Sequence, residues 1–387
     1  MNAIELLEII GSGETSRVQF KKILDNQDGF AAEMIAMSNS KGGIILVGVK
    51  DKTGEIVGLD YPSLQNTSNR IATIANELVK PLIYITTEVV IIDTKPYEKR
   101  VLIVYIEEGI NKPYKDRHGT IWIKQGSDKR RVTDNNEIMR LFQQSGIVYI
   151  DEMIVPNTTI NDIDKDKVKK YLQKIENIEV DIPDEQLYQN LNITKENRLT
   201  LGGLLFFSKK PQQFRPAFCI KAVSFFGNDI AGTDYRGSID IVGTIPELFE
   251  QGIGFFNTYL QHTQQGQNFN STGILEISQI ALEELLQNAL THRDYSKNAP
   301  IRILIFDDRI EIISPGVLPN NLTIENIKMG NAVVRNNLIV SFSSKLMNYR
   351  GFGSGIRRAL KEQPDIELFN DVEGEQFIVT IPRPKRK

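Results

Sequence analysis

The segment ELLQNALTHRDY, residues 284–295, carries the most specific motif of this 387-residue chain. The surrounding pattern predicts a helix over residues 280–291. Glu284 and Asn288 then share one face, because positions i and i+4 lie one above the other. A carboxylate beside a carboxamide can activate a water molecule and supply an oxygen ligand to Mg²⁺. The same spacing is common on solvated helix faces, so its meaning depends on the rest of the sequence.

Three further motifs follow in chain order. A strand-like run ends in Ser314-Pro315-Gly316, residues 335–337 read RNN, and residues 350–358 read RGFGSGIRR. Closely spaced glycines before a helix let backbone N–H groups approach a phosphate, and the helix N-terminus favours an anion. A lone glycine-rich turn would be weak evidence, since lids and tight turns also use one. The four motifs in this order are much more than a chance pattern.

Residues 196 to about 382 resemble the divergent GHKL-type (histidine-kinase-like) ATPase module of bacterial proteins described as transcriptional regulators or helicase-like proteins. The Leu199-Thr200-x-x-Gly203 opening and Gly227 also match. The resemblance implies an α/β sandwich that binds ATP with Mg²⁺. It would make Glu284 the water-activating base and Asn288 the Mg²⁺ ligand. The nucleotide-binding positions would be Asn288, Ser314, Gly316, Gly351, Gly353 and Gly355.

The chain departs from the GHKL pattern at the adenine end of the expected site. Typical members have an aspartate that accepts a hydrogen bond from the adenine amino group, and this chain has Ser314 there. Loss of a charge-assisted hydrogen bond costs about 1.5–3 kcal/mol, or roughly 10- to 150-fold in affinity. A serine hydroxyl can accept a weaker bond. We therefore expect ATP binding, with hydrolysis at most a weak activity.

A second set of motifs lies in residues 1–145. The sequence predicts a helix over 28–39, which Gly42-Gly43 ends, followed by a buried strand over 44–49. Further strands are expected over 83–92, 100–106 and 120–124, and a helix over 134–144. The strings Glu14–Lys21, Met37–Gly43 and Leu46–Asp51 resemble the Schlafen-type AlbA domain, which implies a nucleic-acid-binding α/β module.

Some Schlafen-type members cleave RNA with three acidic residues that hold a divalent metal. The matching positions are Glu14, Gln19 and Asp51. Gln19 keeps an oxygen ligand but removes one of three negative charges, which weakens a site for a hard cation. A metal-dependent nuclease that uses Glu14 and Asp51 is therefore the alternative to simple nucleic-acid binding.

The charge pattern indicates where nucleic acid would bind. The 20 residues from Lys112 to Arg131 hold seven basic and two acidic side chains, a net charge of +5, with aromatic residues between them. Such a mixture suits phosphate contact and base stacking. Five phosphate contacts would give a log–log salt dependence of about −4.5. The predicted binding residues are Lys112, Lys115, Arg117, Trp122, Lys124, Lys129, Arg130 and Arg131; the alternative is a solvated hairpin.

The whole chain is predicted to be an α/β (α+β) protein in three parts. A helical connector over 146–195 joins a domain at 1–145 to a domain at 196–387. An amphipathic helix is expected over 161–176. Strands are expected over 202–207, 222–226 and 377–381, with a hairpin formed by 301–306 and 309–313.

Composition restricts the classes of function. The 46 basic and 49 acidic residues give a net charge of −3, so a polyanion would need a local basic patch. The single cysteine, Cys219, excludes an intrachain disulfide and a cysteine-based zinc site. The aliphatic runs are too short for a spanning helix, and the N-terminus lacks the basic residues of a signal peptide. We expect a soluble cytoplasmic protein with no membrane partner.

The sequence thus predicts a nucleic-acid-binding transcriptional regulator, with DNA favoured over RNA, whose C-terminal module binds ATP with Mg²⁺. Nucleotide occupancy would change nucleic-acid binding through domain arrangement or homo-oligomer state. The alternatives are the nuclease, an ATPase acting on nucleic acid, and an assembly scaffold in which both sites are degenerate. A helicase role does not follow, because the chain has no P-loop motif.

Overall fold

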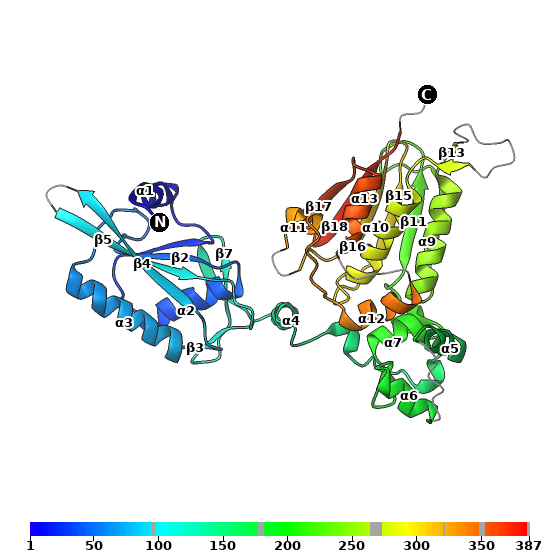
Figure 1. Cartoon of the computed structure of the whole chain (residues 1–387), viewed down its shortest axis with the longest axis horizontal. Helices are drawn as coiled ribbons and strands as arrows, with labels where there is room; N and C mark the ends of the chain where they lie inside the picture. Colours follow the sequence, from blue (N-terminus) through cyan, green and yellow to red (C-terminus); the bar gives the residue numbers. More distant parts are fainter. Residues whose placement is uncertain (95–96, 176–181, 264–272, 320–321, 348–352, 385–387) are drawn as a thin grey trace. The chain divides into compact units, whose positions relative to one another are not determined.

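The computed structural model divides the chain into two compact units, Met1–Val148 and Tyr149–Lys387 (Figure 1). It describes residues 1–94, 97–175, 182–263, 273–319, 322–347 and 353–384. Both units combine helices with a sheet, which confirms the predicted α/β (α+β) class. No helix among these residues is long and apolar enough to cross a membrane.

Unit 1 is built on a four-stranded sheet in the order β1-β2-β5-β4. β1 (Val18–Lys21) runs parallel to β2 (Gly43–Val47). β5 (Tyr97–Ile106) pairs antiparallel with β2 and with β4 (Ile85–Thr94).

Both faces of this sheet are buried, because successive strand side chains alternate between them. Ile45, Val47 and Leu102 pack with α2 (Gln27–Asn39) and α3 (Tyr61–Glu77). Leu46 and Ile103 pack on the opposite side with Leu6 of α1 (Ala3–Ser12). The predicted helix over 28–39 and the buried strand after it are therefore confirmed.

The rest of unit 1 consists of short elements around α2. β3 (Val79–Lys80) pairs with β6 (Lys115–Asp116), and β7 (Trp122–Gln125) forms a hairpin with β8 (Asp128–Arg131). α4 (Asn135–Gln144) follows the hairpin. The Asn39 side chain links α2 to β7, because its Nδ2 atom donates to the main-chain oxygens of Tyr114 and Trp122 at 2.9 Å each.

Unit 2 is built on a six-stranded sheet in the order β12-β11-β15-β16-β18-β17. β11 and β15 are parallel, and the other neighbours are antiparallel. The strands span Ile220–Phe225 (β11), Tyr235–Ile241 (β12), Ile301–Ile305 (β15), Arg309–Pro315 (β16), Glu367–Asp371 (β17) and Gln376–Pro382 (β18). The predicted hairpin is β15–β16, and the predicted last strand is β18.

Helices cover one face of this sheet (Figure 1). α9 (Ile245–Tyr259), α10 (Gln279–His292) and α13 (Gly355–Glu362) contribute Phe256, Leu286 and Ala359 to the main core of the unit. Smaller elements complete the unit: α8 (Pro211–Phe214), β13 (His262–Thr263), β14 (Ile274–Leu275), α11 (Ile324–Lys328) and α12 (Asn337–Leu346).

The segment expected to be a connector, 146–195, belongs from Tyr149 onward to unit 2. It contains η1 (Ile150–Glu152), η2 (Ile160–Asp162), α5 (Lys165–Lys174), α6 (Asp184–Asn190) and β9 (Thr194–Lys195), which pairs with β10 (Arg198–Leu199). Tyr171 of α5 packs edge-on against Phe207 and Phe342, with ring centroids 5.3 and 5.4 Å away. The hydrophobic face of this helix is therefore buried in the fold of unit 2.

The strand predicted over 202–207 is wrong, because α7 (Leu201–Phe207) occupies that position. Every residue of α7 is buried, so its uninterrupted apolar run has neither the alternation of a strand nor the stripe of a surface helix. The side chain of Thr200 caps the helix by accepting a hydrogen bond from the Gly203 amide at 2.9 Å.

Candidate functional site

α10 presents the two polar residues of the central motif to a pocket in unit 2. Leu285 and Leu286 of the same helix are 2% and 0% exposed and anchor it in the core of the unit. The Asn288 side-chain amide donates to the main-chain oxygen of Glu284 at 2.7 Å. Because the amide nitrogen is used in this bond, the Oδ1 atom of Asn288 is the one available to a cation.

The residues predicted for nucleotide binding meet at this pocket. Those among the described residues that line it are Glu284, Asn288, Ser314, Gly316, Gly353 and Gly355. They come from α10, from the end of β16 and from the turn that begins α13. Gly351, the remaining predicted glycine, lies outside the described residues. Apolar side chains, including Ile312, Leu318 and Phe377, line the same pocket and suit a flat aromatic ligand.

Two glycines allow close packing around the start of α13, Gly353 against Gly330 and Gly355 against α10. Gly353 has φ +67°, and a Cβ atom there would lie 2.1 Å from the main-chain oxygen of Gly330. A Cβ atom on Gly355 would lie 2.4 Å from Oε2 of Glu284 and 3.1 Å from Nδ2 of Asn288. The first turn of α13 therefore packs directly on the two motif residues, where helix N–H groups favour an anion.

Ser314 lies at the adenine position of the predicted site. It is 7% exposed, and its hydroxyl donates to the main-chain oxygen of Ala289 at 3.2 Å. That bond links β16 to α10 and uses the only hydrogen of the hydroxyl, so toward a ligand Ser314 can only accept.

Two pocket residues were missed by the sequence reasoning, although both lie inside quoted motifs. Arg358, in the first turn of α13, donates from Nη2 to Oε1 of Glu284 at 2.7 Å. His292 ends α10 and lines the pocket, and burial, with the nearby Arg335 charge, lowers its pKa to about 4. The sequence signal for Arg358 is its position three residues after Gly355, about one helical turn along α13.

The last part of the central motif is structural. The Arg293 guanidinium is buried over the rings of Phe218 and Tyr295, at 4.7 and 4.8 Å from their centroids. Asn336 is also buried, and its amide donates to the main-chain oxygens of Thr291 and Arg293 at 2.9 Å each. These contacts fix the end of α10 beside the pocket.

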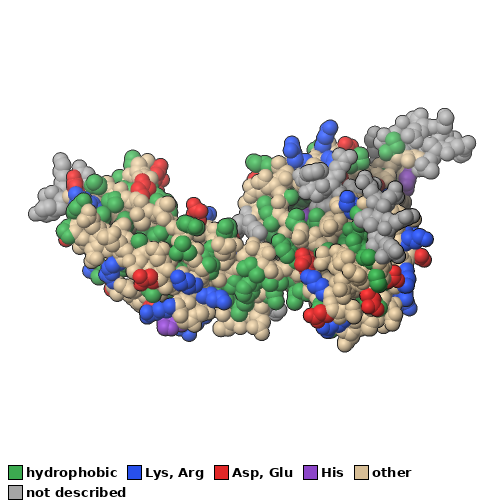
Figure 2. All heavy atoms as spheres, turned by 60° about the horizontal axis from the view of Figure 1, so that its bottom comes forward, with side chains coloured by type: hydrophobic (Ala, Val, Ile, Leu, Met, Phe, Trp, Pro, Cys, Tyr) green, Lys and Arg blue, Asp and Glu red, His purple; other side chains and the backbone are tan. Residues whose placement is uncertain are grey.

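The positive charge of the basic segment of unit 1, residues 112–131, is largely neutralised by acidic residues from outside the segment. Lys112 pairs with Glu108, Arg117 with Asp28 at 2.7 Å, Lys124 with Glu33 at 3.3 Å, Lys129 with Glu33 at 2.6 Å and Arg130 with Glu137 at 2.5 Å. These four carboxylates offset four of the five excess positive charges. Figure 2 shows Lys and Arg side chains still gathered on the surface of unit 1.

Two of the predicted binding residues are out of reach of a phosphate. The side chains of Lys112 and Lys124 are 4% and 1% exposed, whereas those of Arg117 and Arg130 are 50% and 42% exposed. Burial also lowers the pKa of Lys112.

Within the described residues, Lys115 and Arg131 form no ion pair. Arg131 stacks over the Trp122 ring at 5.1 Å, and Trp122 donates to Asp116 at 2.9 Å.

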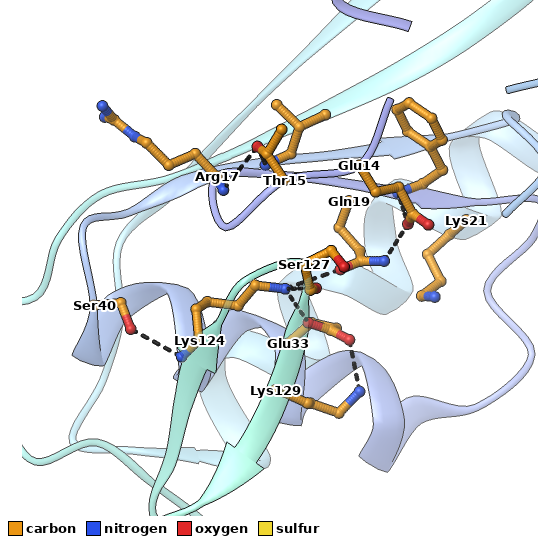
Figure 3. A network of polar contacts seen from close by, with 12 residues as sticks. Glu14, Thr15, Arg17, Gln19, Lys21, Glu33, Ser40, Lys124, Ser127 and Lys129 are labelled. Carbon is orange, nitrogen blue, oxygen red and sulfur yellow. Dashed lines mark hydrogen bonds and ion pairs between the residues drawn. The ribbon is translucent and has the colours of Figure 1, made fainter. Parts of the chain in front are cut away.

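The buried Lys124 ammonium is the centre of a polar network (Figure 3). It donates to Oε1 of Gln19 at 2.9 Å, to Oε2 of Glu33 at 3.3 Å and to the main-chain oxygen of Ser127. Gln19 in turn donates to Glu14. Of the three predicted metal-ligand positions, Gln19 is the one that Lys124 contacts, so the side-chain oxygen of Gln19 already accepts a hydrogen bond from an ammonium group.

The residues proposed for metal-dependent cleavage are engaged separately. Asp51 pairs with Lys21 at 2.9 Å, whereas Glu14 accepts from Gln19 and from the Phe20 amide at 2.9 Å. Among the described residues, no group of three or more His, Cys, Asp and Glu side chains could hold a metal ion. This arrangement gives the nuclease alternative no support. In unit 2, by contrast, the predicted Mg²⁺ ligand is one amide oxygen, Oδ1 of Asn288. One protein ligand fits an Mg²⁺ ion that is bound together with nucleotide phosphates, because this ion usually keeps few protein ligands.

Comparison with family models matches three stretches of the chain. A model described as "Schlafen, AlbA_2" matches residues 14–133, and one described as "Putative ATP-dependent DNA helicase recG C-terminal" matches residues 298–381. The chain carries a Schlafen AlbA_2 domain and a recG-like C-terminal HATPase_c_4 domain. A domain of unknown function (DUF8451) matches residues 139–221, which span the boundary between the two units.

The HATPase_c_4 match contains Ser314, Gly316, Gly353 and Gly355 but begins after Glu284 and Asn288. The pocket thus combines a matched region with α10, which lies outside it. No curated protein matches the chain. Among solved structures, the DIP2311 protein from Corynebacterium diphtheriae is 20% identical with a TM-score of 0.49, and the alignment covers 99% of this chain and 80% of that one.

Proposed function

We propose that this protein is a DNA-binding transcriptional regulator whose HATPase_c_4 unit binds ATP with Mg²⁺ and whose AlbA_2 unit binds nucleic acid. The observation that carries the proposal is the meeting of Glu284, Asn288, Ser314, Gly316, Gly353 and Gly355 in one pocket. Three separate segments of the chain supply these residues. Their convergence supports the GHKL-type site that the motifs predict.

Each side of the pocket has its own role in this proposal. The apolar lining and the Ser314 hydroxyl would receive the adenine ring, and the start of α13 would bind the phosphates. The Oδ1 atom of Asn288 would hold Mg²⁺, which neutralises phosphate charge when bound. Glu284 would orient and deprotonate water in any hydrolysis.

The proposal of nucleic-acid binding rests on the AlbA_2 match and on the fully or partly exposed basic side chains of residues 112–131. Lys115, Arg117, Arg130 and Arg131 are the side chains that can reach phosphates, and Trp122 can contribute its partly exposed ring. We propose DNA as the ligand because the second matched family is named for the C-terminal part of a DNA helicase.

The test compares nucleic-acid affinity with and without nucleotide. Fluorescence anisotropy with labelled duplex DNA and single-stranded RNA is measured in Mg²⁺ alone, with ADP and with ATP. We expect ATP to change the affinity for DNA, and Asn288→Ala to abolish that change while leaving nucleotide-free binding intact. Identical affinities in all conditions, together with no nucleotide binding, would reject the proposal.

Hydrolysis is a separate question that the same pocket raises. Phosphate release would be measured for the whole chain and for Glu284→Gln. A slow release that Glu284→Gln removes would make the regulator a weak ATPase. Release that survives the substitution would show that Glu284 is not the base.

A further inference from the structure

The nucleotide pocket contains an ion pair that blocks the residue proposed as the base. Oε1 of Glu284 accepts from Nη2 of Arg358 at 2.7 Å, and the Glu284 side chain is only 13% exposed. Its other oxygen, Oε2, lies against Gly355, where even a methyl group would not fit. In this state α13 covers the carboxylate on both oxygens.

Arg358 has hydrogen-bonding capacity that Glu284 does not use. Its Nε atom is buried, and no acceptor among the described residues reaches it. A buried donor without a partner costs free energy unless a ligand satisfies it. A guanidinium presents its donors in a planar fork that matches the geometry of a phosphate.

The position of Arg358 identifies which phosphate it would meet. Glu284 and Asn288 lie one helical turn apart, so the proposed base and the proposed Mg²⁺ ligand face the same end of the nucleotide. A base that activates the attacking water must lie beside the terminal phosphate. Because Arg358 touches Glu284, it lies beside that phosphate too.

We propose that Arg358 recognises the terminal phosphate of a nucleoside triphosphate, and that its transfer from Glu284 to this phosphate frees the carboxylate. The inference rests on the proposed nucleotide binding, and it adds that the pocket selects a triphosphate over a diphosphate or a monophosphate. A monophosphate would leave the Glu284–Arg358 pair intact, and a diphosphate would lack the group that displaces it. Only a triphosphate would produce the state with a free base.

A purely structural ion pair makes different predictions. The pair also joins α10 to α13, so its loss could simply loosen the helix packing. In that case ATP, ADP and AMP would all bind more weakly, in parallel with a fall in Tm. Recognition of the terminal phosphate predicts a loss confined to ATP.

The test is calorimetric titration of the whole chain with ATP, ADP and AMP in the presence of Mg²⁺. The variants are Arg358→Ala, Arg358→Lys and Glu284→Gln, with Arg357→Ala as the matched control on the same helix. We expect Arg358→Ala to weaken ATP binding roughly 10- to 150-fold, as for a hydrogen bond to a charged group. Affinities for ADP and AMP should change less than about threefold, and Arg357→Ala should behave like the wild type. Arg358→Lys should restore part of the affinity for ATP.

Glu284→Gln supplies a second and independent readout. A neutral carboxamide at this position cannot hold the guanidinium by charge, so ATP would no longer compete with the carboxylate and should bind several-fold more tightly. Equal losses for ATP and ADP in Arg358→Ala, or no loss at all, would overturn the inference while the proposed function stands. No binding of any nucleotide by the wild type would reject both.

Discussion

Gly355 lies so close to Glu284 that a Cβ atom on it would be 2.4 Å from the carboxylate Oε2 atom. Real carbon–oxygen contacts are longer, so any side chain at this position must displace α13 or rotate Glu284. The same Cβ atom would be 3.1 Å from the amide nitrogen of Asn288. The geometry of both motif residues therefore depends on a residue that has no side chain.

Gly355→Ala should damage the nucleotide site more than the fold. Overpacking at a tight contact costs about 1–3 kcal/mol, so we expect a roughly 5- to 150-fold loss of ATP affinity by calorimetry. Gly254→Ala in α9 is the matched control, because its Cβ atom would meet no atom within 4 Å. Wild-type affinity in Gly355→Ala would show that α13 does not form the phosphate end of the pocket.

Asp151→Asn should stabilise the protein at neutral pH. Asp151 is fully buried in η1 and accepts a hydrogen bond from the Ile339 amide at 2.9 Å, and burial raises its pKa to about 6. Between the unfolded pKa of about 3.8 and this value, the folded state binds the extra proton, so the stability contributed by this group falls as pH rises. Above pH 6 the penalty is about 3 kcal/mol, which asparagine avoids.

The measurement is urea unfolding of wild type and Asp151→Asn from about pH 4 to about pH 8. The variant's advantage should grow up to about pH 6 and stay constant above it. The His292 contribution runs the opposite way, because its lowered pKa favours the folded state as pH rises, but it is common to both proteins and cancels in the difference. A difference that does not vary with pH would contradict the raised pKa of Asp151.

Nucleic-acid binding should depend on salt less steeply than the net charge of the basic segment suggests. Lys112 and Lys124 are buried, and Arg117, Lys129 and Arg130 are held in ion pairs. Phosphate contacts by the two remaining basic residues, Lys115 and Arg131, would give a log–log slope of about −2 rather than about −4.5. Lys115→Ala should make the slope shallower by about 1, because the variant would lose one phosphate contact from this partly exposed side chain. A slope near the steeper value for the wild type would show that the paired lysines and arginines leave their carboxylates to bind phosphate.

Lys124→Ala should destabilise unit 1 without acting on the nucleic acid directly. Removing one partner of a buried ion pair costs about 3–5 kcal/mol, because Glu33 would keep a buried charge with less compensation. Thermal unfolding of Lys124→Ala and Lys115→Ala provides the comparison, and the second variant should change stability by less than about 0.5 kcal/mol. Equal Tm values for the two variants would contradict the structural role of Lys124.

The sequence pattern identified those features that local spacing determines. Glu284 and Asn288 share a face because of helical periodicity, and Gly353 and Gly355 precede a helix in one short motif. The partner of Arg358 is Glu284, 74 residues earlier, and the partner of Lys124 is Glu33, 91 residues earlier. Charge counting along the chain treats such side chains as exposed, so it could not show that Lys124 is buried or that Arg358 covers the base.

The same limit explains the errors in secondary structure. The run over 202–207 is apolar on all sides because α7 is completely enclosed, and periodicity carries no signal for such a segment. The helix predicted over 161–176 contains α5 (Lys165–Lys174), but the pattern could not show that Tyr171 packs edge-on against both Phe207 and Phe342. The residues that pack against the apolar face of an amphipathic helix come from distant parts of the chain, so the local pattern does not identify them.

Calorimetric titration with ATP and Mg²⁺, for the wild type and for Asn288→Ala, tests the central claim most directly. We expect the wild type to bind ATP, and Asn288→Ala to lose the part of the affinity that depends on Mg²⁺, by roughly tenfold or more. Titration with ATP in EDTA should give the two proteins similar, weaker affinities. Absence of binding by the wild type, or equal Mg²⁺-dependent binding by both proteins, would show that this pocket is not an ATP–Mg²⁺ site.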